Sequence, residues 1–168
     1  ATVILTGYRV QPLMENPIFT AESPTDFWGR KWNRVIHHCL KNGVYLPMRK
    51  HSCPRAVAAV GAFLASGFFH DWLLTFVMAL DKFCVDCYSI PLFGATAFML
   101  WNSALISLEY TFGKTKVVQQ LAQKLPRLLI TFSVISMALP VAHWFCDPYT
   151  RSGFFDSLSV ALPLIRKM

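Results

Sequence analysis

Charged residues are scarce in this sequence. Asp, Glu, Lys and Arg together make up 15% of the 168 residues, whereas 54% of the residues are hydrophobic. The mean hydropathy of +0.40 is higher than that of ordinary soluble domains, so it excludes that class of protein. We therefore expect an integral membrane protein, in which each spanning helix needs about 20 predominantly apolar residues.

Acidic residues are the scarcer of the two charged kinds. Nine Asp and Glu stand against sixteen Lys and Arg, which gives a net charge of +7. No RNA- or DNA-binding motif accompanies the basic residues, so we expect no nucleic-acid partner and attribute them to the positive-inside bias of membrane proteins. Residues Ala1–Pro12 lack the basic n-region and cleavage pattern of a signal peptide, and the first residue is not methionine. A first residue other than methionine is typical of a processed or truncated chain.

A clear metal or disulfide pattern is also absent. Cys84 and Cys87 have the spacing of a redox pair or of half a zinc site, but no second pair of ligands lies near them in the sequence. The other cysteines are scattered at Cys39, Cys53 and Cys146. We interpret the cysteines as free or locally paired, and we expect no metal site and no tightly bound cofactor.

A helix is predicted to begin after Ser23. Residues 1–22 are expected to form an N-terminal loop. Ser23 is a typical N-cap residue, Pro24 suits the first helical position, and Asp26 stands three residues after the cap as in a capping box. Gly43 and then Pro47 predict the end of this helix. The remainder of residues 23–55 is predicted to be a basic loop containing Arg49, Lys50, His51 and Arg55.

The predicted helix is amphipathic. At 100° per residue its apolar face carries Trp28, Trp32, Val35, Ile36, Cys39 and Leu40, and its opposite face carries Arg30, Arg34, His37 and Lys41. Tryptophans at the edge of an apolar stripe with a cationic reverse face favour a helix that lies in the plane of the lipid headgroups. The alternative is a helix packed on other protein with solvated arginines. Asn33 lies at the border between the two faces.

Three apolar stretches are candidates for spanning helices, at about residues 56–80, 90–108 and 128–145, and Pro140 is expected to kink the third. A fourth stretch, 154–165, is interpreted as interfacial, re-entrant or a partial span. The predicted fold class is therefore all-α: a membrane multi-helix bundle in residues 56–168, with three or four spanning helices, preceded by the interfacial amphipathic helix. Lys and Arg gather in residues 26–55 and in the hydrophilic loop 113–127, which places both segments on the cytosolic side.

Polar residues inside these apolar stretches indicate a structural or functional role, since an ionisable group near the bilayer centre costs about 2.5 kcal/mol or more. His70 has small neighbours, Ser66 and Gly67, that would let another helix or a substrate approach. Asp71 is about 100° away from His70 on a helix, so we do not expect a His-Asp relay. Asn102 and Glu109 share one side of the second span, either as a seam packed on other helices or as a wall facing a substrate.

Two blocks of this sequence resemble the signature of the membrane-bound O-acyltransferase family. The first is Phe27-Trp28-Gly29-Arg30-Lys31-Trp32-Asn33, with His37 and Tyr45-Leu46-Pro47 after it, and the second is Ser66-Gly67-Phe68-Phe69-His70-Asp71. The chain is most similar to the wax synthase, diacylglycerol and sterol acyltransferase branch. The resemblance extends from about residue 16 to the final predicted helix. It corresponds to the C-terminal half of the family, whose members enclose the reaction chamber with more helices.

The resemblance implies transfer of a fatty acyl group from acyl-CoA to the hydroxyl of a lipid alcohol, giving a wax ester, a triacylglycerol or a sterol ester. It implies that His70 is the general base and that Asn33 binds the thioester carbonyl or the acceptor. It also implies membrane lipids and acyl-CoA as partners and the endoplasmic reticulum as the location, with another organellar membrane as the alternative. The expected substrate-binding residues are Arg30, Trp32, Arg34, His37, Ser66, Gly67 and Asn102, of which Arg30 and Arg34 would meet the coenzyme A phosphates.

A second function remains open. A membrane subunit derived from the same family could keep these residues as helix contacts inside a homo-oligomer or a larger membrane complex. The intact signature blocks favour the enzyme, whereas the small number of predicted spans favours the subunit. A transporter or channel would use similar intramembrane polar residues, but the sequence has no repeat or pair of broken helices to support it.

Overall fold

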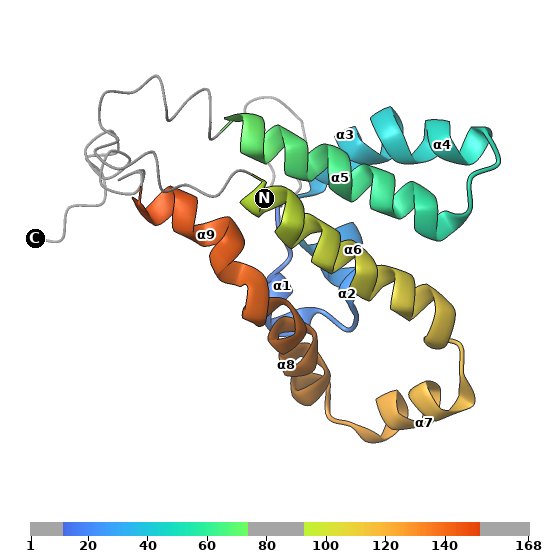
Figure 1. The fold of residues 1–168 in the computed structure, drawn as a ribbon. Helices are drawn as coiled ribbons and strands as arrows, with labels where there is room; N and C mark the ends of the chain where they lie inside the picture. Colours follow the sequence, from blue (N-terminus) through green and yellow to red (C-terminus); the bar gives the residue numbers. More distant parts are fainter. Residues whose placement is uncertain (1–11, 74–92, 152–168) are drawn as a thin grey trace, which may run out of the picture.

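The computed structural model describes residues 12–73 and 93–151, and within these two ranges the chain is helical with no β-strand (Figure 1). The predicted all-α class is therefore confirmed. The elements in chain order are α1 (Pro17–Thr20), α2 (Pro24–Asp26), η1 (Phe27–Lys31), α3 (Arg34–Leu40), η2 (Lys41–Tyr45), α4 (Leu46–Lys50), α5 (Arg55–Leu73), α6 (Gly94–Phe112), α7 (Lys116–Lys124), α8 (Arg127–Ala138), η5 (Leu139–Val141) and α9 (Ala142–Arg151).

An antiparallel pair of long helices, α5 and α6, forms the centre of the described fold (Figure 1). Small residues line their contact: Ala59, Ser66 and Gly67 on α5, and Ala95 and Thr96 on α6, are all buried. A Cβ atom at Gly67 would lie 2.5 Å from the Cα of Thr96, so the two backbones touch where Gly67 has no side chain. Such close approach is how helices pack where van der Waals contact must replace the hydrophobic effect.

The N-cap at Ser23 is present as predicted. Its hydroxyl accepts a hydrogen bond from the Asp26 backbone N–H at 3.1 Å, and Pro24 is the first helical residue. The helix then widens into the π-helical turn η1 and stops, because Trp32 is extended (ψ −179°). Asn33 starts a new helix, α3, by accepting a bond from the Ile36 N–H at 3.2 Å. The amphipathic segment is thus two helical pieces joined at an angle, and not one continuous helix.

The second of these pieces is longer than predicted. The prediction that Gly43 ends the helix is wrong, because the π-helical turn η2 (Lys41–Tyr45) carries the helix through Gly43 into α4. Pro47 does not stop it either, and it lies at the beginning of α4, directly after the π-helical turn η2. As a result the predicted basic loop is reduced to a short turn, with Arg49 and Lys50 at the end of α4 and Arg55 at the start of α5.

The segment 113–127 is also more regular than the predicted loop, because it contains α7. The third predicted span is α8 followed by the 3₁₀ turn η5 and by α9, and Pro140 lies in that turn, as the predicted kink requires.

Two hydrogen bonds fix α8 to its neighbours: the Thr131 hydroxyl donates to the Ala21 carbonyl at 2.7 Å, and the Trp101 Nε1–H donates to the Met137 carbonyl at 2.8 Å.

The buried core is small and many large apolar side chains are exposed. Phe98, Met99 and Val141 are buried and pack against Trp28 and Phe145, among others. Exposed apolar residues include Phe68, Phe69 and Trp72 on α5 and Leu128, Leu129 and Phe132 on α8. Within the described ranges two helices are long and apolar enough to cross a membrane, judged by length and composition: Arg55–Leu73 and Arg127–Thr150.

The membrane bundle of three or four spans therefore stays a prediction. The predicted second span corresponds to α6, which is not one of these two helices. Residues 74–80 of the first predicted span, the partial span 154–165, and Cys84 and Cys87 lie outside the described residues. From the sequence, the cysteines are interpreted as free or locally paired. In the described residues Cys39, Cys53 and Cys146 are free.

The close contact at Gly67 can be tested by substitution. Gly67→Ala should lower the free energy of unfolding in detergent by about 1–3 kcal/mol, because the added methyl forces α5 and α6 apart. The matched control is Gly43→Ala: a Cβ there meets nothing within 4 Å, and alanine is the better helix former by up to about 1 kcal/mol. Equal effects of the two substitutions would contradict the packing described here.

Candidate active site

His70 lies in the last described turn of α5 and faces α9. Its Nδ1 is 3.1 Å from the Tyr149 hydroxyl oxygen, within hydrogen-bond distance. The Phe145 ring, one turn before Tyr149 on α9, meets the imidazole edge-on with ring centres 5.0 Å apart. The imidazole is half-buried and is held at two points by one helix.

The neighbouring Asp71 points at the start of α6. Its two carboxylate oxygens accept hydrogen bonds from the Ala95 and Thr96 backbone N–H groups, each at 3.0 Å, and one of them also accepts from the Thr96 hydroxyl. The first N–H groups of a helix have no partner within the helix, and the N-cap residue Phe93 makes no side-chain cap. Asp71 therefore supplies the cap of α6 from α5.

The first signature block is joined to this region through aromatic contacts. The Trp28 ring lies 6.2 Å from that of Phe98, Phe98 lies 5.2 Å from Phe145, and Phe145 contacts His70. Trp28 also donates its Nε1–H to the Asn102 Oδ1 at 3.1 Å. Trp28 is therefore packed on protein. This agrees with the alternative interpretation of the amphipathic segment, a helix packed on other protein, as far as Trp28 is concerned.

Asn102 and Glu109 form a polar seam that packs on other helices. Asn102 is 2% exposed, and besides accepting from Trp28 it donates to the Phe98 carbonyl at 2.9 Å. Glu109 accepts a hydrogen bond from the Thr25 backbone N–H at 2.8 Å. Both residues hold the N-terminal segment against α6. A substrate-binding role of Asn102 stays a prediction, and its amide oxygen and nitrogen each have a protein partner.

Asn33 and Trp32 occupy the break between η1 and α3. The Asn33 Oδ1 caps α3, and within the described residues no hydrogen bond or ring contact joins Asn33 to His70. Trp32 is 37% exposed and stacks on Phe27 with ring centres 5.5 Å apart. Gly67 lies against Thr96 of α6, so the approach that its small size permits is made by a helix, and Ser66 beside it is buried.

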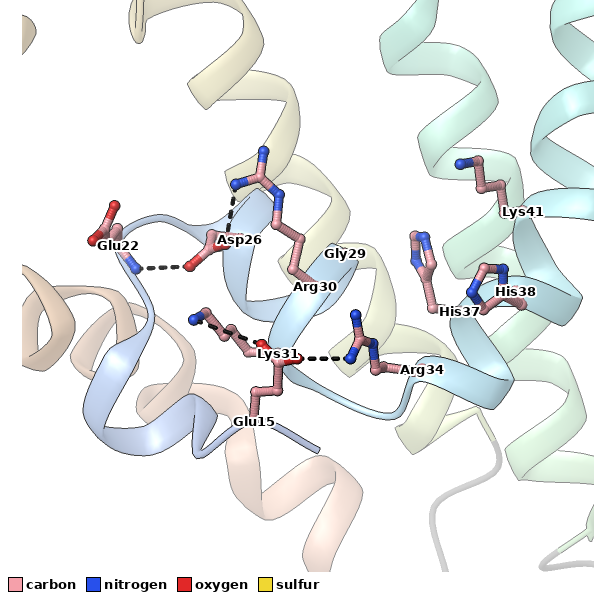
Figure 2. A pocket seen from close by; sticks show the side chains of 10 residues that line it. All are labelled: Glu15, Glu22, Asp26, Gly29, Arg30, Lys31, Arg34, His37, His38 and Lys41. Carbon is pink, nitrogen blue, oxygen red and sulfur yellow. Dashed lines mark hydrogen bonds and ion pairs between the residues drawn. The ribbon is translucent and has the colours of Figure 1, made fainter. Parts of the chain in front are cut away.

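A charged cleft of about 410 Å³ lies along η1 and α3 (Figure 2). Four cationic side chains and three carboxylates line it, with both histidines of α3: Glu15, Glu22, Asp26, Gly29, Arg30, Lys31, Arg34, His37, His38 and Lys41. Glu15 pairs with Arg34 at 2.6 Å and with Lys31 at 4.0 Å, and Asp26 pairs with Arg30 at 3.6 Å. Among the described residues no carboxylate lies within 4.0 Å of Lys41.

The cleft brings together three of the predicted substrate-binding residues, Arg30, Arg34 and His37. Desolvation lowers the pKa of His37 from its usual value of 6.5, and the nearby Lys41 and His38 lower it further. His37 is therefore biased towards the neutral form. Within residues 12–73 and 93–151 no group of three His, Cys, Asp or Glu side chains could hold a metal ion.

Two residues at the site, Tyr149 and Phe145, were not among those predicted from the sequence. Their spacing of four along α9 places them on one helical face, which the sequence does show. Their partner His70 is 79 positions away from Tyr149, and no local sequence pattern predicts that contact.

Comparison with known proteins agrees with the signature blocks. Residues 10–94, about half of the chain, match the family described as Membrane bound O-acyl transferase family. The chain belongs to this family. The matched O-acyltransferase region includes Asn33, the charged cleft and His70. No solved structure matches the chain significantly.

Several curated proteins are similar to this chain. The chain is 27% identical to Probable long-chain-alcohol O-fatty-acyltransferase 3 of Arabidopsis thaliana over 95% of its own length, and 28% identical to the protein numbered 9 of that series over 89%. It is 30% identical to Diacylglycerol O-acyltransferase 1A of Glycine max over 82% of its own length. The matches cover 46%, 43% and 25% of those proteins, so the chain spans less than half the length of each.

The lowered pKa of His37 predicts a pH effect on stability. The unfolded chain takes up a proton at this residue below about pH 6.5, before the folded chain does, so the folded state loses stability as the pH falls through that range. The melting temperature of the wild type should therefore drop more between about pH 8 and about pH 5.5 than that of His37→Gln. The exposed His51 offers the control, since His51→Gln should follow the wild type. Equal drops for wild type and His37→Gln would contradict the prediction.

Proposed function

We propose that this chain carries the acyl-transfer site of a membrane-bound O-acyltransferase that moves a fatty acyl group from acyl-CoA to the hydroxyl of a lipid alcohol. The observation that supports the proposal best is the setting of His70. It lies on an apolar helix of membrane-spanning length, half-buried, with its Nδ1 bonded to Tyr149 and its ring packed on Phe145. An ionisable residue in such a helix is by default a functional one.

The proposed reaction uses His70 as a general base. The Nε2 atom removes the proton from the acceptor hydroxyl while its oxygen attacks the thioester carbonyl carbon. The tetrahedral intermediate then collapses, the carbon–sulfur bond breaks, and the coenzyme A thiolate takes the proton from the imidazolium. The products are the ester and free coenzyme A, and the imidazole is again neutral. A positioned base of this kind contributes about 10²- to 10⁴-fold to the rate.

Asn33 is proposed to stabilise the developing negative charge on the thioester oxygen. Its Oδ1 is used to cap α3, which fixes the side chain and leaves the Nδ2–H₂ group as a donor. Losing one such donor costs about 2.7–4 kcal/mol in related acyl-transfer chemistry. The role requires that the substrate bridge the distance between the cap of α3 and the imidazole on α5.

The charged cleft is proposed to receive the phosphates of coenzyme A. Arg30, Arg34 and His37 line it, as the resemblance implied, and Lys41 is added by the structure. Figure 2 shows these four side chains around the same space. Arg30 and Arg34 are paired with carboxylates, whereas Lys41 has no acidic partner among the described residues, so it is the cation best placed to bind a phosphate.

The antiparallel arrangement of α5 and α6 supports a cytosolic location of the end of the pair at which basic residues gather. It brings the start of α5, with Arg55, and the end of α6, followed by Lys114 and Lys116, to the same end of the helix pair (Figure 1). Arg49 and Lys50 precede α5 at that end. Clustered Lys and Arg mark the cytosolic side of a membrane protein, and acyl-CoA would be met there. The endoplasmic reticulum is the membrane we propose, on the family resemblance.

Among the possible acceptors, we propose long-chain alcohols as the preferred class. Two of the relatives named for long-chain alcohols match 95% and 89% of this chain, more than the 82% matched by Diacylglycerol O-acyltransferase 1A. A structural subunit is the second candidate, because Gly67 and Asn102 are both used in contacts between helices. The two candidates differ in whether His70 is needed for chemistry or for assembly.

Acyl transfer in membranes separates the two candidates. The chain would be expressed alone and within its complete gene product, and each would be given labelled acyl-CoA with a long-chain alcohol, a diacylglycerol or a sterol. We expect the complete product to form the labelled ester of the alcohol, and His70→Ala to reduce the rate at least about 100-fold with unchanged expression.

His143→Ala is the matched histidine control, because His143 is exposed on α9 and should tolerate the change. If the complete product transfers no acyl group, and His70→Ala alters only expression or assembly, the enzyme is excluded and the structural subunit is favoured.

The role of Lys41 is tested by kinetics. Lys41→Gln should raise KM for acyl-CoA about tenfold and leave kcat unchanged, because one charge-assisted contact to a phosphate contributes about 1.5 kcal/mol or more. The increase should shrink at high salt. Lys50→Gln removes the same charge from the exposed end of α4, outside the cleft, and should have little effect. Equal changes in KM for both variants would argue against binding in the cleft.

A further inference from the structure

The contact between His70 and Tyr149 joins two helices that are far apart in the sequence. Nδ1 of the imidazole and the Tyr149 hydroxyl oxygen lie 3.1 Å apart across the α5–α9 contact. Among the described residues this is the one hydrogen-bond contact of the His70 side chain, and its Nε2 has none. The two ring nitrogens therefore stand in different environments, one engaged by a phenol and the other left for a substrate.

Phe145 restricts the rotation of the same ring. It meets the imidazole at 74° with ring centres 5.0 Å apart, and its own ring lies 5.4 Å from that of Tyr149 and 5.2 Å from that of Phe98. An edge-on ring on one side and a hydroxyl on Nδ1 together fix the plane of the imidazole. A 180° flip of the ring about its Cβ–Cγ bond would put the Cδ2–H group in the place of Nδ1 and would lose the contact with the Tyr149 hydroxyl.

A neutral imidazole carries one proton, and the partner of one nitrogen decides where that proton resides. If the Tyr149 O–H donated to Nδ1, the proton would be on Nε2, and that nitrogen could not accept another. If the Tyr149 oxygen accepts from Nδ1–H, the lone pair of Nε2 is free. A base at Nε2 therefore requires the second arrangement.

We propose that Tyr149 is a positioning residue that accepts a hydrogen bond from Nδ1–H of His70 and thereby keeps Nε2 as the nitrogen that takes the acceptor's proton. The base role of that nitrogen rests on the proposed acyl transfer, whereas the tautomer does not. In this role Tyr149 acts through the orientation and the protonation of the imidazole.

The tautomer can be measured without any substrate. Solid-state ¹⁵N NMR of the histidine-labelled protein in bilayers distinguishes a protonated Nδ1 from a protonated Nε2, and a His70→Ala spectrum identifies the His70 signals among the five histidines. We expect Nδ1–H in the wild type and a mixture of both tautomers in Tyr149→Phe. Phe145→Leu changes the packing on the same ring but leaves the hydroxyl, so it should keep the Nδ1–H tautomer.

Kinetics of the complete gene product then connect the tautomer to the reaction. Tyr149→Phe should lower kcat about tenfold, a part of the contribution of a general base, with KM for acyl-CoA and for the alcohol within about twofold of the wild type. A purely structural loss would reduce the amount of active enzyme and the melting temperature instead. Tyr110→Phe, at a tyrosine that is 38% exposed on α6, is the control and should change neither constant.

The results separate the two proposals. A protonated Nε2 in the wild type, or an unchanged tautomer in Tyr149→Phe, would overturn the positioning role whatever the activity. A complete product that shows the Nδ1–H tautomer but transfers no acyl group would overturn the proposed function and the base role, while supporting the hydrogen bond to Tyr149. Loss of kcat in Tyr149→Phe together with the expected change of tautomer supports both.

Discussion

The described fold depends on the bond between the Asp71 carboxylate and the N-terminus of α6. The first N–H groups of a helix are partial positive charges that need an acceptor, and in apolar surroundings no water supplies one. Asp71 meets the Ala95 and Thr96 N–H groups from α5, so α6 cannot slide along α5 without losing both bonds. The close contact of Gly67 with Thr96 is possible because this register is fixed.

The same interaction orients His70. Adjacent residues on a helix point about 100° apart, so when Asp71 is directed at α6 the imidazole is directed towards α9, where Phe145 and Tyr149 lie. One short block of α5 thus holds a residue that sets the helix register and a residue proposed for chemistry. Both are polar groups in an apolar helix, and the partners that satisfy them come from different helices.

The charged cleft and the imidazole lie on different elements with different surroundings. The cleft, on η1 and α3, is lined by cations and carboxylates that are partly exposed to solvent. His70 is packed among aromatic rings. Phosphate recognition tolerates water, whereas proton transfer to a general base is stronger where water is excluded. Trp28, which is bonded to Asn102 and packed on Phe98, connects the two regions through protein contacts.

Local chemistry determined what the sequence could predict. The cap at Ser23, the turn at Pro140, the all-α class and the two signature blocks each depend on residues close together in the chain. Tertiary structure decided the rest. Packing carried a helix through Gly43 and Pro47, and it interrupted the predicted helix at Trp32 and Asn33. Partners such as Tyr149 for His70, 79 positions apart, were set by how α9 docks on α5, and no short-range pattern encodes that geometry.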